Sequence, residues 1–307
     1  MQTLLHAAQH GALIVSRPDL ATLEVLGPDR TSWLNAVVTN DLAPLARRAA
    51  VFTLALSKKG KLLADSFVLS LPDRLLLSVD PLAAPDLLAH LNHFLVMEDA
   101  EIRLSHEAFS WALVLGPSAF AALDLARSLT GVAAAVPVAF SDTDAGLLLL
   151  QPNAERAVLE SLAASRPHVA TASLETFDLL RIDLGIPRFP LDYGSDTYPQ
   201  EAGLDTRAVS FNKGCYLGQE IVVKMRSRGH PARTLVRVHL PGGSPVPDPK
   251  TPVCNLVGEV IGAITSASLS LLTPGVCAFA NVRWSQGTVG SPVVVGQHEG
   301  RILPLVA

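Results

Sequence analysis

The sequence predicts an α+β protein with two related α+β lobes, mainly antiparallel sheets and a small C-terminal β-barrel. Short apolar strands alternate with single helices over the first 184 residues, which is typical of α+β lobes. A strand that runs into a Gly-Pro helix start occurs at 23–29 and again at 112–118, which indicates an internal repeat. From residue 233 onward, short β-branched runs between Gly and Pro predict a barrel or sandwich.

The first lobe is predicted from strand and turn signals in the first hundred residues. Segments 12–16 and 21–26 are typical of strands, and we interpret them as a hairpin. A helix should begin at 27–29 and end near Val38, because proline suits the first helical turn and Asp29 suits the positive end of the dipole. The other expected elements are strands at 49–57, 62–71 and 74–79 and a helix at 81–95.

The second lobe and the barrel follow in the same way. Residues 185–203 are rich in Gly, Pro and Asp, and a loop that long without regular structure is usually functional. The other expected elements are strands at 134–140, 146–150, 233–240, 256–265, 276–283 and 288–295 and helices at 153–165 and 173–184. We therefore expect a two-lobed region at 1–231 (1–45 with 110–231, and 46–109) and a barrel at 232–307.

Composition and charge exclude several classes of protein. The 307 residues carry 24 Lys and Arg against 28 Asp and Glu, so no overall positive field attracts nucleic acid or anionic lipid. No apolar stretch approaches the roughly 20 residues that span a bilayer. The N-terminus has no basic region before its apolar stretch, so we expect a cytoplasmic protein. From the net charge and the short apolar stretches, we expect neither nucleic-acid nor membrane partners.

The segment 211–233, FNKGCYLGQEIVVKMRSRGHPAR, is the most informative part of the chain. Cys215 lies between glycines and beside Lys213, which favours the reactive thiolate; the alternative is a buried cysteine in a tight turn. Cys254 and Cys277 lie among apolar residues and are expected to be buried. Three cysteines at these spacings form neither a disulfide framework nor a zinc site, and no metal site is predicted.

A run of cations with a single acid, Glu220, occupies 213–237 and is a candidate clamp for carboxylate or phosphate. On extended backbone, Arg226 and Arg228 would share one face; a solvated basic surface is the alternative. Three acceptors lie upstream, namely Asp183, Gln200 and Glu201. A carboxylate can accept two parallel N–H bonds from an aminopyrimidine ring while a cation holds an anionic tail, so a folate is one of several ligands that fit.

The motif KGCYLGQE at 213–220 resembles the signature of the YgfZ family of folate-binding proteins, relatives of the glycine-cleavage T-protein. Similar segments run through the chain: LEVLGPDRTSWLNAVVTNDL, SKKGKLLADSFVL, LLRIDLGIP and PQEAGL. The resemblance implies α+β lobes and a barrel in a ring around a channel that takes tetrahydrofolate or a one-carbon-substituted form. It also implies a role in making or maintaining iron–sulfur enzymes, which would be client partners.

The resemblance places the motif cysteine, Cys215, at the channel together with Lys213, Tyr216 and Gln219. Asp183 stands where T-proteins have a pteridine-binding glutamate. From residue chemistry, Gln200 and Glu201 are further pteridine contacts, and Arg226 and Arg228 contact the glutamate tail.

One departure separates this chain from the T-proteins. They carry two acids where this chain has Ala64 and Asp65, and neighbouring side chains on a strand point to opposite faces. Since aminomethyl transfer needs a positioned carboxylate, we predict a folate-binding protein that supports iron–sulfur enzymes, with Cys215 and Lys213 as the reacting pair. A tetrahydrofolate-dependent aminomethyltransferase and a non-catalytic folate-regulated scaffold remain the alternatives.

Overall fold

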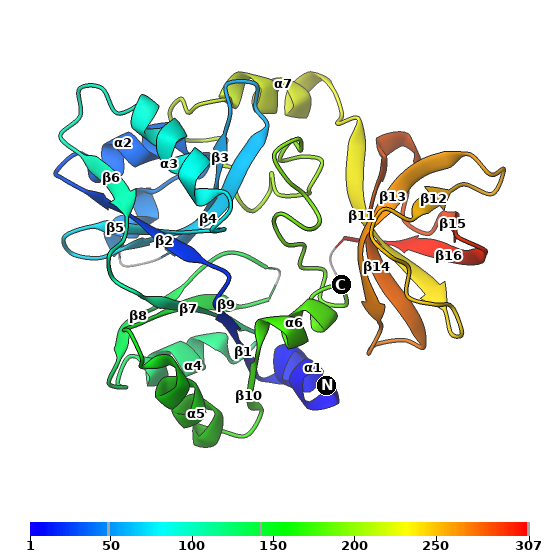
Figure 1. Cartoon of the computed structure of the whole chain (residues 1–307), viewed down its shortest axis with the longest axis horizontal. Helices are drawn as coiled ribbons and strands as arrows, with labels where there is room; N and C mark the ends of the chain where they lie inside the picture. Colours follow the sequence, from blue (N-terminus) through cyan, green and yellow to red (C-terminus); the bar gives the residue numbers. More distant parts are fainter. Residues whose placement is uncertain (48–49, 142, 306–307) are drawn as a thin grey trace. The chain divides into compact units, whose positions relative to one another are not determined.

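The computed structural model describes residues 1–47, 50–141 and 143–305. The chain divides into two compact units (Figure 1). The first is Met1–Leu174 with Thr206–Gln219, and the second is Glu175–Asp205 with Glu220–Ala307. Within the described part, no helix has the length and apolar character that crossing a bilayer requires.

The first unit contains a five-stranded sheet in the order β3-β4-β5-β2-β6, with every neighbouring pair antiparallel. Its strands are β2 (Ala21–Leu26), β3 (Ala50–Leu56), β4 (Leu62–Ser70), β5 (Leu75–Val79) and β6 (Glu101–Leu104). Two helices, α2 (Arg30–Val37) and α3 (Ala84–His93), bury apolar side chains against one face, among them Leu34 and Leu87 against Val68. A 3-10 turn, η1, spans Ala43–Arg47.

A second five-stranded sheet in the same unit has the order β10-β1-β7-β9-β8. Its strands are β1 (Ala12–Arg17), β7 (Ser110–Leu115), β8 (Val132–Pro137), β9 (Ala145–Leu150) and β10 (Val169–Ala172). Only β1 and β10 pair in parallel among these described strands. The helices α4 (Ala119–Ala126) and α5 (Glu155–Ser165) pack on it through Leu123 and Leu162. Two sheets, each with a pair of helices, confirm the predicted α+β lobes.

The predicted hairpin of β1 and β2 is wrong. The strands exist, but β1 pairs with β7 and β10, whereas β2 pairs with β5 and β6 of the other sheet. Both are central strands with buried apolar faces, and each sheet supplies partners from distant sequence. The sequence interpretation also lacked α1 (Gln2–His10), β6 and β10.

The second unit contains a closed six-stranded barrel in the order β11-β14-β13-β12-β15-β16. Its strands are β11 (Arg233–Pro241), β12 (Pro252–Cys254), β13 (Val260–Leu269), β14 (Gly275–Arg283), β15 (Pro292–Val295) and β16 (His298–Leu303), with a 3-10 turn η2 (Trp284–Gln286). Val236 and Val238 on β11 fill the interior, while Leu235 packs outward against Ile182. The closed strand order confirms the barrel that the sequence predicts. Side chains alternate along β11, so one set packs inside the barrel and the other packs outside it.

Two helices flank an irregular segment. They are α6 (Leu174–Leu180) and α7 (Gln219–Arg228), and residues 181–218 between them form neither helix nor strand. This agrees with the long loop expected from the sequence, and all of the predicted site residues before α7 lie in it.

Candidate functional site

Lys213 belongs to the first unit and points at the end of α2. Its ammonium donates to the backbone carbonyls of Asn35, Val38 and Asn40, at 2.9 Å for the last two. Burial lowers the pKa of Lys213 to about 8, because an ammonium loses hydration there; the nearby Asp41 carboxylate acts in the opposite direction. A lysine has three N–H donors, so these carbonyls account for all of them.

The sequence pairs Lys213 with Cys215, whereas in the structure its hydrogen-bond partners are three backbone carbonyls. The last carbonyls of a helix have no intrahelical donor, and a cation there also complements the helix dipole. Lys213 thus caps α2, and its three N–H donors are used by these carbonyls. The structure therefore shows Lys213 in a positioning role at the end of α2, and its catalytic role beside Cys215 stays a prediction.

Tyr216 and Gly218 show how the motif packs in the first unit. Tyr216 is 6% exposed, its ring lies 5.5 Å from the Lys213 ammonium, and burial raises the pKa of its phenol to about 12. The Tyr216 hydroxyl is buried and has no hydrogen-bond partner among the described residues. Gly218 has φ +82°, and a Cβ there would come within 2.7 Å of the Ser57 carbonyl oxygen. The glycine therefore lets the motif approach the β3–β4 turn closely.

Cys215 is the accessible thiol of the three. It is exposed, and a side chain at the neighbouring Gly214 would meet no atom within 4 Å. Cys254 is partly buried, and Cys277 is buried in the barrel wall, where burial raises the pKa of its thiol to about 11. Cys215 is therefore not the buried cysteine of the alternative interpretation, and the reactivity of its thiol stays a prediction.

The Thr-Asn-Asp element at 39–41 anchors the segment that carries the motif. The Thr39 hydroxyl donates to the Ala208 carbonyl at 2.6 Å, and the Asn40 amide donates to the carbonyls of Phe52 (2.9 Å) and Arg207 (3.3 Å). These bonds tie residues 207–208 to β3. The element therefore positions the backbone of the candidate site.

Asp183, in the second unit, is committed to the barrel. Its carboxylate accepts from the Ser270 hydroxyl at 2.8 Å and from the Leu271 backbone N–H at 2.7 Å, and the residue is 2% exposed. Arg237, 4% exposed, donates to the Asp183 carbonyl at 2.8 Å. The Asp183 carboxylate thus holds the loop after β13, and the pteridine contact that the sequence suggested stays a prediction.

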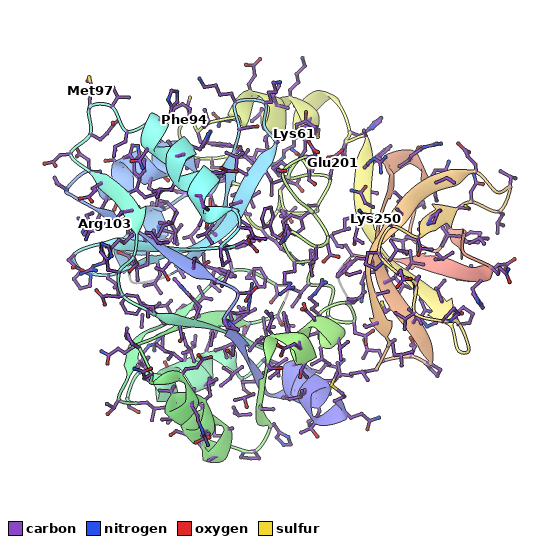
Figure 2. All side chains as sticks on the ribbon, viewed as in Figure 1. Lys61, Phe94, Met97, Arg103, Glu201 and Lys250 are labelled. Carbon is purple, nitrogen blue, oxygen red and sulfur yellow. The ribbon has the colours of Figure 1, made fainter. Side chains whose placement is uncertain are left out.

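Gln200 and Glu201 lie in the irregular segment of the second unit; Figure 2 labels Glu201. Glu201 is 8% exposed, and its carboxylate accepts from the Tyr198 N–H at 3.0 Å while its carbonyl accepts from the Leu235 N–H at 2.7 Å. The Gln200 amide donates to the Val222 carbonyl at 2.8 Å. Its amide oxygen is buried and has no donor among the described residues. These two neighbours thus offer a buried carboxylate and a buried unpaired acceptor.

Gln219, Arg226 and Arg228 lie on α7, which begins at the residue after Gly218. The expectation of extended backbone at Arg226 and Arg228 is wrong, since both residues lie on a helix. Arg226 is exposed, and the side chain of Arg228 lies outside the described residues.

A buried ion pair that the sequence interpretation missed organises the irregular segment. Arg181 (1% exposed side chain) pairs with Asp192 (0%), and Asp192 also accepts from the hydroxyls of Thr265 (2.8 Å) and Ser266 (2.6 Å) on β13. Arg181 gave no sequence signal of this pairing, because Asp192 lies in the same irregular segment without a regular spacing and the two hydroxyls come from the distant β13. The pair fastens 181–192 to the barrel.

The pair Ala64–Asp65 lies on β4, with its two side chains on opposite faces. Ala64 is fully buried in the core under α2 and α3, and Asp65 lies on the other face, opposite Leu54 of β3. Phe52 and Phe67, whose ring centroids are 5.0 Å apart, share the face of Asp65. An acid at 64 would enter the apolar core, so this position holds a single usable carboxylate.

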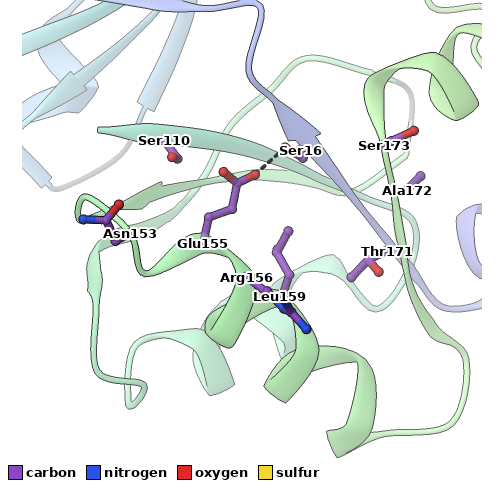
Figure 3. A pocket seen from close by; sticks show the side chains of 9 residues that line it. All are labelled: Ser16, Ser110, Asn153, Glu155, Arg156, Leu159, Thr171, Ala172 and Ser173. Atoms are coloured by element: carbon purple, nitrogen blue, oxygen red, sulfur yellow. Dashed lines mark hydrogen bonds between the residues drawn. The ribbon is translucent and has the colours of Figure 1, made fainter. Parts of the chain in front are cut away.

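Several cavities of the first unit lack Cys215 in their walls, and two of them contain polar side chains of interest. One, of about 560 Å³, has Asn40 and Asp41 in its wall. The other, of about 540 Å³, lies between α5 and strands β1, β7 and β10, and there Glu155 accepts a hydrogen bond from Ser16 (Figure 3). No group of three or more metal-ligating side chains occurs in the part of the chain that the structure describes.

Residues 5–141 match the GCVT N-terminal domain family. The chain is 28% identical over 228 residues to the tRNA-modifying protein YgfZ of Vibrio vulnificus, covering 72% of this chain and 68% of that one. It is 26% identical over 260 residues to the mitochondrial iron–sulfur cluster assembly factor IBA57 homolog of Neosartorya fischeri, covering 75% and 58%.

Aminomethyltransferases are similar over more of the chain. That of Halothermothrix orenii is 27% identical over 293 residues, covering 88% of this chain and 80% of that one. The crystal structure of the glycine cleavage system aminomethyltransferase T from Bartonella henselae superimposes with a TM-score of 0.79 over 99% of this chain and 87% of that chain, at 20% identity, and so shares its fold. The chain is a YgfZ-type relative of the glycine-cleavage aminomethyltransferase T family.

Proposed function

We propose that this protein binds tetrahydrofolate or a one-carbon-substituted form and supports the assembly or repair of iron–sulfur enzymes. The name of one relative, an iron–sulfur cluster assembly factor homolog, supports the second half; others are a tRNA-modifying protein and aminomethyltransferases. The observation that carries the folate assignment is the adjacent pair of buried acceptors at Gln200 and Glu201.

The residues present fit a pterin ring. The Glu201 carboxylate is held by one backbone N–H from Tyr198, and the Gln200 amide oxygen is buried without a donor. A buried acceptor without a donor costs about 1–3 kcal/mol, which a ligand N–H would recover. The pterin presents an amino group beside a ring N–H, and a carboxylate can accept both. Arg226, exposed on α7, is the proposed contact for the anionic glutamate tail.

The proposed working group is the exposed thiol of Cys215. Tyr216 and Gln219 complete the same motif, and their part in folate binding rests on the resemblance of the motif. Cys215→Ser should leave folate affinity nearly unchanged while an iron–sulfur enzyme in cells that depend on the protein loses its activity. A Cys215→Ser strain with normal iron–sulfur enzyme activity would refute the thiol role and leave folate binding intact.

The test of the folate assignment is anaerobic calorimetry with reduced tetrahydrofolate. Wild type should bind in the micromolar range, near −8 kcal/mol. Glu201→Gln retains an oxygen for the Tyr198 N–H but loses the charge, so affinity should fall about 10- to 150-fold, the equivalent of about 1.5–3 kcal/mol for a charge-assisted bond. The matched control, Glu299→Gln on an exposed barrel position, should bind as wild type does. Absence of heat with any reduced folate would refute the assignment.

An aminomethyltransferase activity is the second candidate, favoured by the wide coverage of that family and by Asp65 on the face of β4 opposite Ala64. Turnover of an aminomethylated lipoyl carrier, lost in Asp65→Asn, would establish it. Folate binding without such turnover would favour the first proposal.

A further inference from the structure

An exposed pair of stacked aromatic rings lies at the barrel, where residues 230–233 meet the end of β14. The ring centroids of His230 and Trp284 are 4.1 Å apart and their planes differ by 7°. Both residues are exposed, Trp284 to 45%. The other two tryptophans, Trp33 and Trp111, are 3% and 1% exposed. Trp284 is thus a surface platform and not a core residue.

The backbone fixes this platform beside two arginines. The backbone N–H of Trp284 donates to the Ala232 carbonyl at 3.0 Å, so the hydrogen-bond ladder between β11 and β14 continues to Trp284. Arg233 and Arg283 are direct cross-strand partners in that ladder and are both exposed. Cross-strand partners project from the same face of a sheet. Two guanidinium side chains therefore leave the barrel on one face, and each is close along the chain to one of the rings, since Arg283 precedes Trp284 and Arg233 follows His230 by three residues.

The charges in this patch are not balanced. Like charges directly opposite one another destabilise a strand pair. Arg283 is compensated by an ion pair with Glu259, whereas Arg233 forms no ion pair with any described residue. One cation is therefore left beside the aromatic platform, and a bound anion would relieve the repulsion between the two arginines.

We propose that this patch, formed by His230, Arg233, Arg283 and Trp284, binds single-stranded nucleic acid. An unpaired base would stack on the His230–Trp284 pair, and the adjoining phosphate would lie on the arginines. Exposed aromatic rings beside cations are how proteins hold single strands without reading sequence. In a duplex the bases already stack on one another, and lipid headgroups and acidic peptides offer no flat ring next to each charge.

The inference is independent of the proposed folate binding, because none of these four residues belongs to the proposed folate contacts. It also revises the expectation, drawn from the net charge of −4, that nucleic acid is not a partner. An average over the chain hides a local arrangement of two cations and two rings.

The first test is fluorescence anisotropy of the full-length protein with labelled 12-nucleotide strands of RNA and DNA at low salt. Trp284→Ala should weaken binding about 5- to 150-fold, since stacking on an aromatic ring contributes about 1–3 kcal/mol per base. Trp284→Phe keeps a ring and should retain most of the affinity. In wild type, the strand should also protect Trp284 emission from acrylamide, because the other two tryptophans are buried.

The second test separates the arginines from general charge. Each phosphate contact in a single strand contributes about 0.7 to the slope of log affinity against log salt. Arg233→Gln should reduce the slope by about that amount, whereas the matched control Arg301→Gln, an exposed barrel arginine, should leave the slope unchanged. RNA and DNA strands should bind alike, because no group in the patch is assigned to a 2′-hydroxyl.

Several outcomes would overturn the proposal. One is that wild type binds no strand at low salt, and another is that Trp284→Ala binds the strand as tightly as wild type does. A third is that a duplex or a mononucleotide binds wild type as tightly as the strand does. A fourth is that Arg233→Gln and Arg301→Gln change the salt slope by the same amount. Displacement of the strand by anionic vesicles or an acidic peptide at equal concentration would also refute it. Thermal unfolding of each variant shows whether it is folded.

Discussion

Replacing Lys213 by methionine distinguishes two roles for the motif lysine. The sequence suggests that its charge activates the neighbouring Cys215, whereas in the structure its ammonium donates to the carbonyls of Asn35, Val38 and Asn40. Methionine keeps the length and apolar stem of the side chain and removes every donor. If the carbonyl contacts are the role, Lys213→Met destabilises the first unit and leaves the reactivity of the thiol unchanged.

The magnitude follows from those three contacts. Hydrogen bonds to a charged group contribute about 1.5–3 kcal/mol each, and the desolvation of a half-buried ammonium offsets a large part of the sum. We therefore expect a loss of about 2–4 kcal/mol in the free energy of unfolding. At about 2–4 °C per kcal/mol for a unit of this size, the Tm should fall by roughly 4–16 °C. Lys224→Met, at an exposed position on α7, is the matched control and should change the Tm little.

Two assays test this prediction. Thermal unfolding gives the Tm, and the rate of iodoacetamide alkylation at Cys215, located by mass spectrometry, gives the reactivity of the thiol. Because the folded-state pKa of Lys213 is lowered to about 8, the unfolded chain binds more protons above that pH. The stability of wild type relative to Lys213→Met should therefore rise between about pH 8 and 10.5. An unchanged Tm together with slower alkylation of Cys215 would refute the capping role.

Three further predictions concern other buried groups. Tyr216→Phe should raise the stability of the ligand-free protein by about 1 kcal/mol in chemical denaturation, because it removes a buried hydroxyl that has no partner among the described residues; a loss of stability would show that this hydroxyl is bonded. Asp192→Asn should destabilise the second unit by about 3–5 kcal/mol in the same assay, because it leaves the Arg181 guanidinium buried and unpaired; a change under 1 kcal/mol would contradict this. In mass-spectrometric alkylation without denaturant, Cys215 should react and Cys277 should not, since burial raises the pKa of Cys277 to about 11; equal labelling of the two would overturn the burial argument.

Local patterns in the sequence predict most of the secondary structure correctly. The Gly-Pro start of α2, the strands β3, β4 and β5, and the alternation along β11 are all local signals, and each element is found close to its expected residues. The pairing of β1 and β2 failed because strand partners depend on which distant segments are available, and the spacing of two neighbours does not contain that information.

The candidate site shows the same division. The motif at 213–220 and the PQEAGL segment are readable in the sequence because their residue types and glycines are unusual together. The task of each polar side chain is not readable there. Asp183 and Lys213 look like ligand or catalytic groups, yet Asp183 accepts from the Ser270 hydroxyl and the Leu271 backbone N–H, and Lys213 donates to the end of α2.

The sequence alone thus determined the α+β lobes, the barrel, the resemblance to YgfZ and the segments that carry polar chemistry, because periodicity, turn residues and motifs are properties of neighbours in the chain. Only the tertiary structure decided which groups are already satisfied and which are left over. Asp183 and Lys213 are satisfied, whereas the Gln200 amide oxygen is buried without a described donor and Arg233 has no described acidic partner. The reason is physical: hydrogen bonds, burial and charge balance are set by atoms that the fold brings together from distant segments.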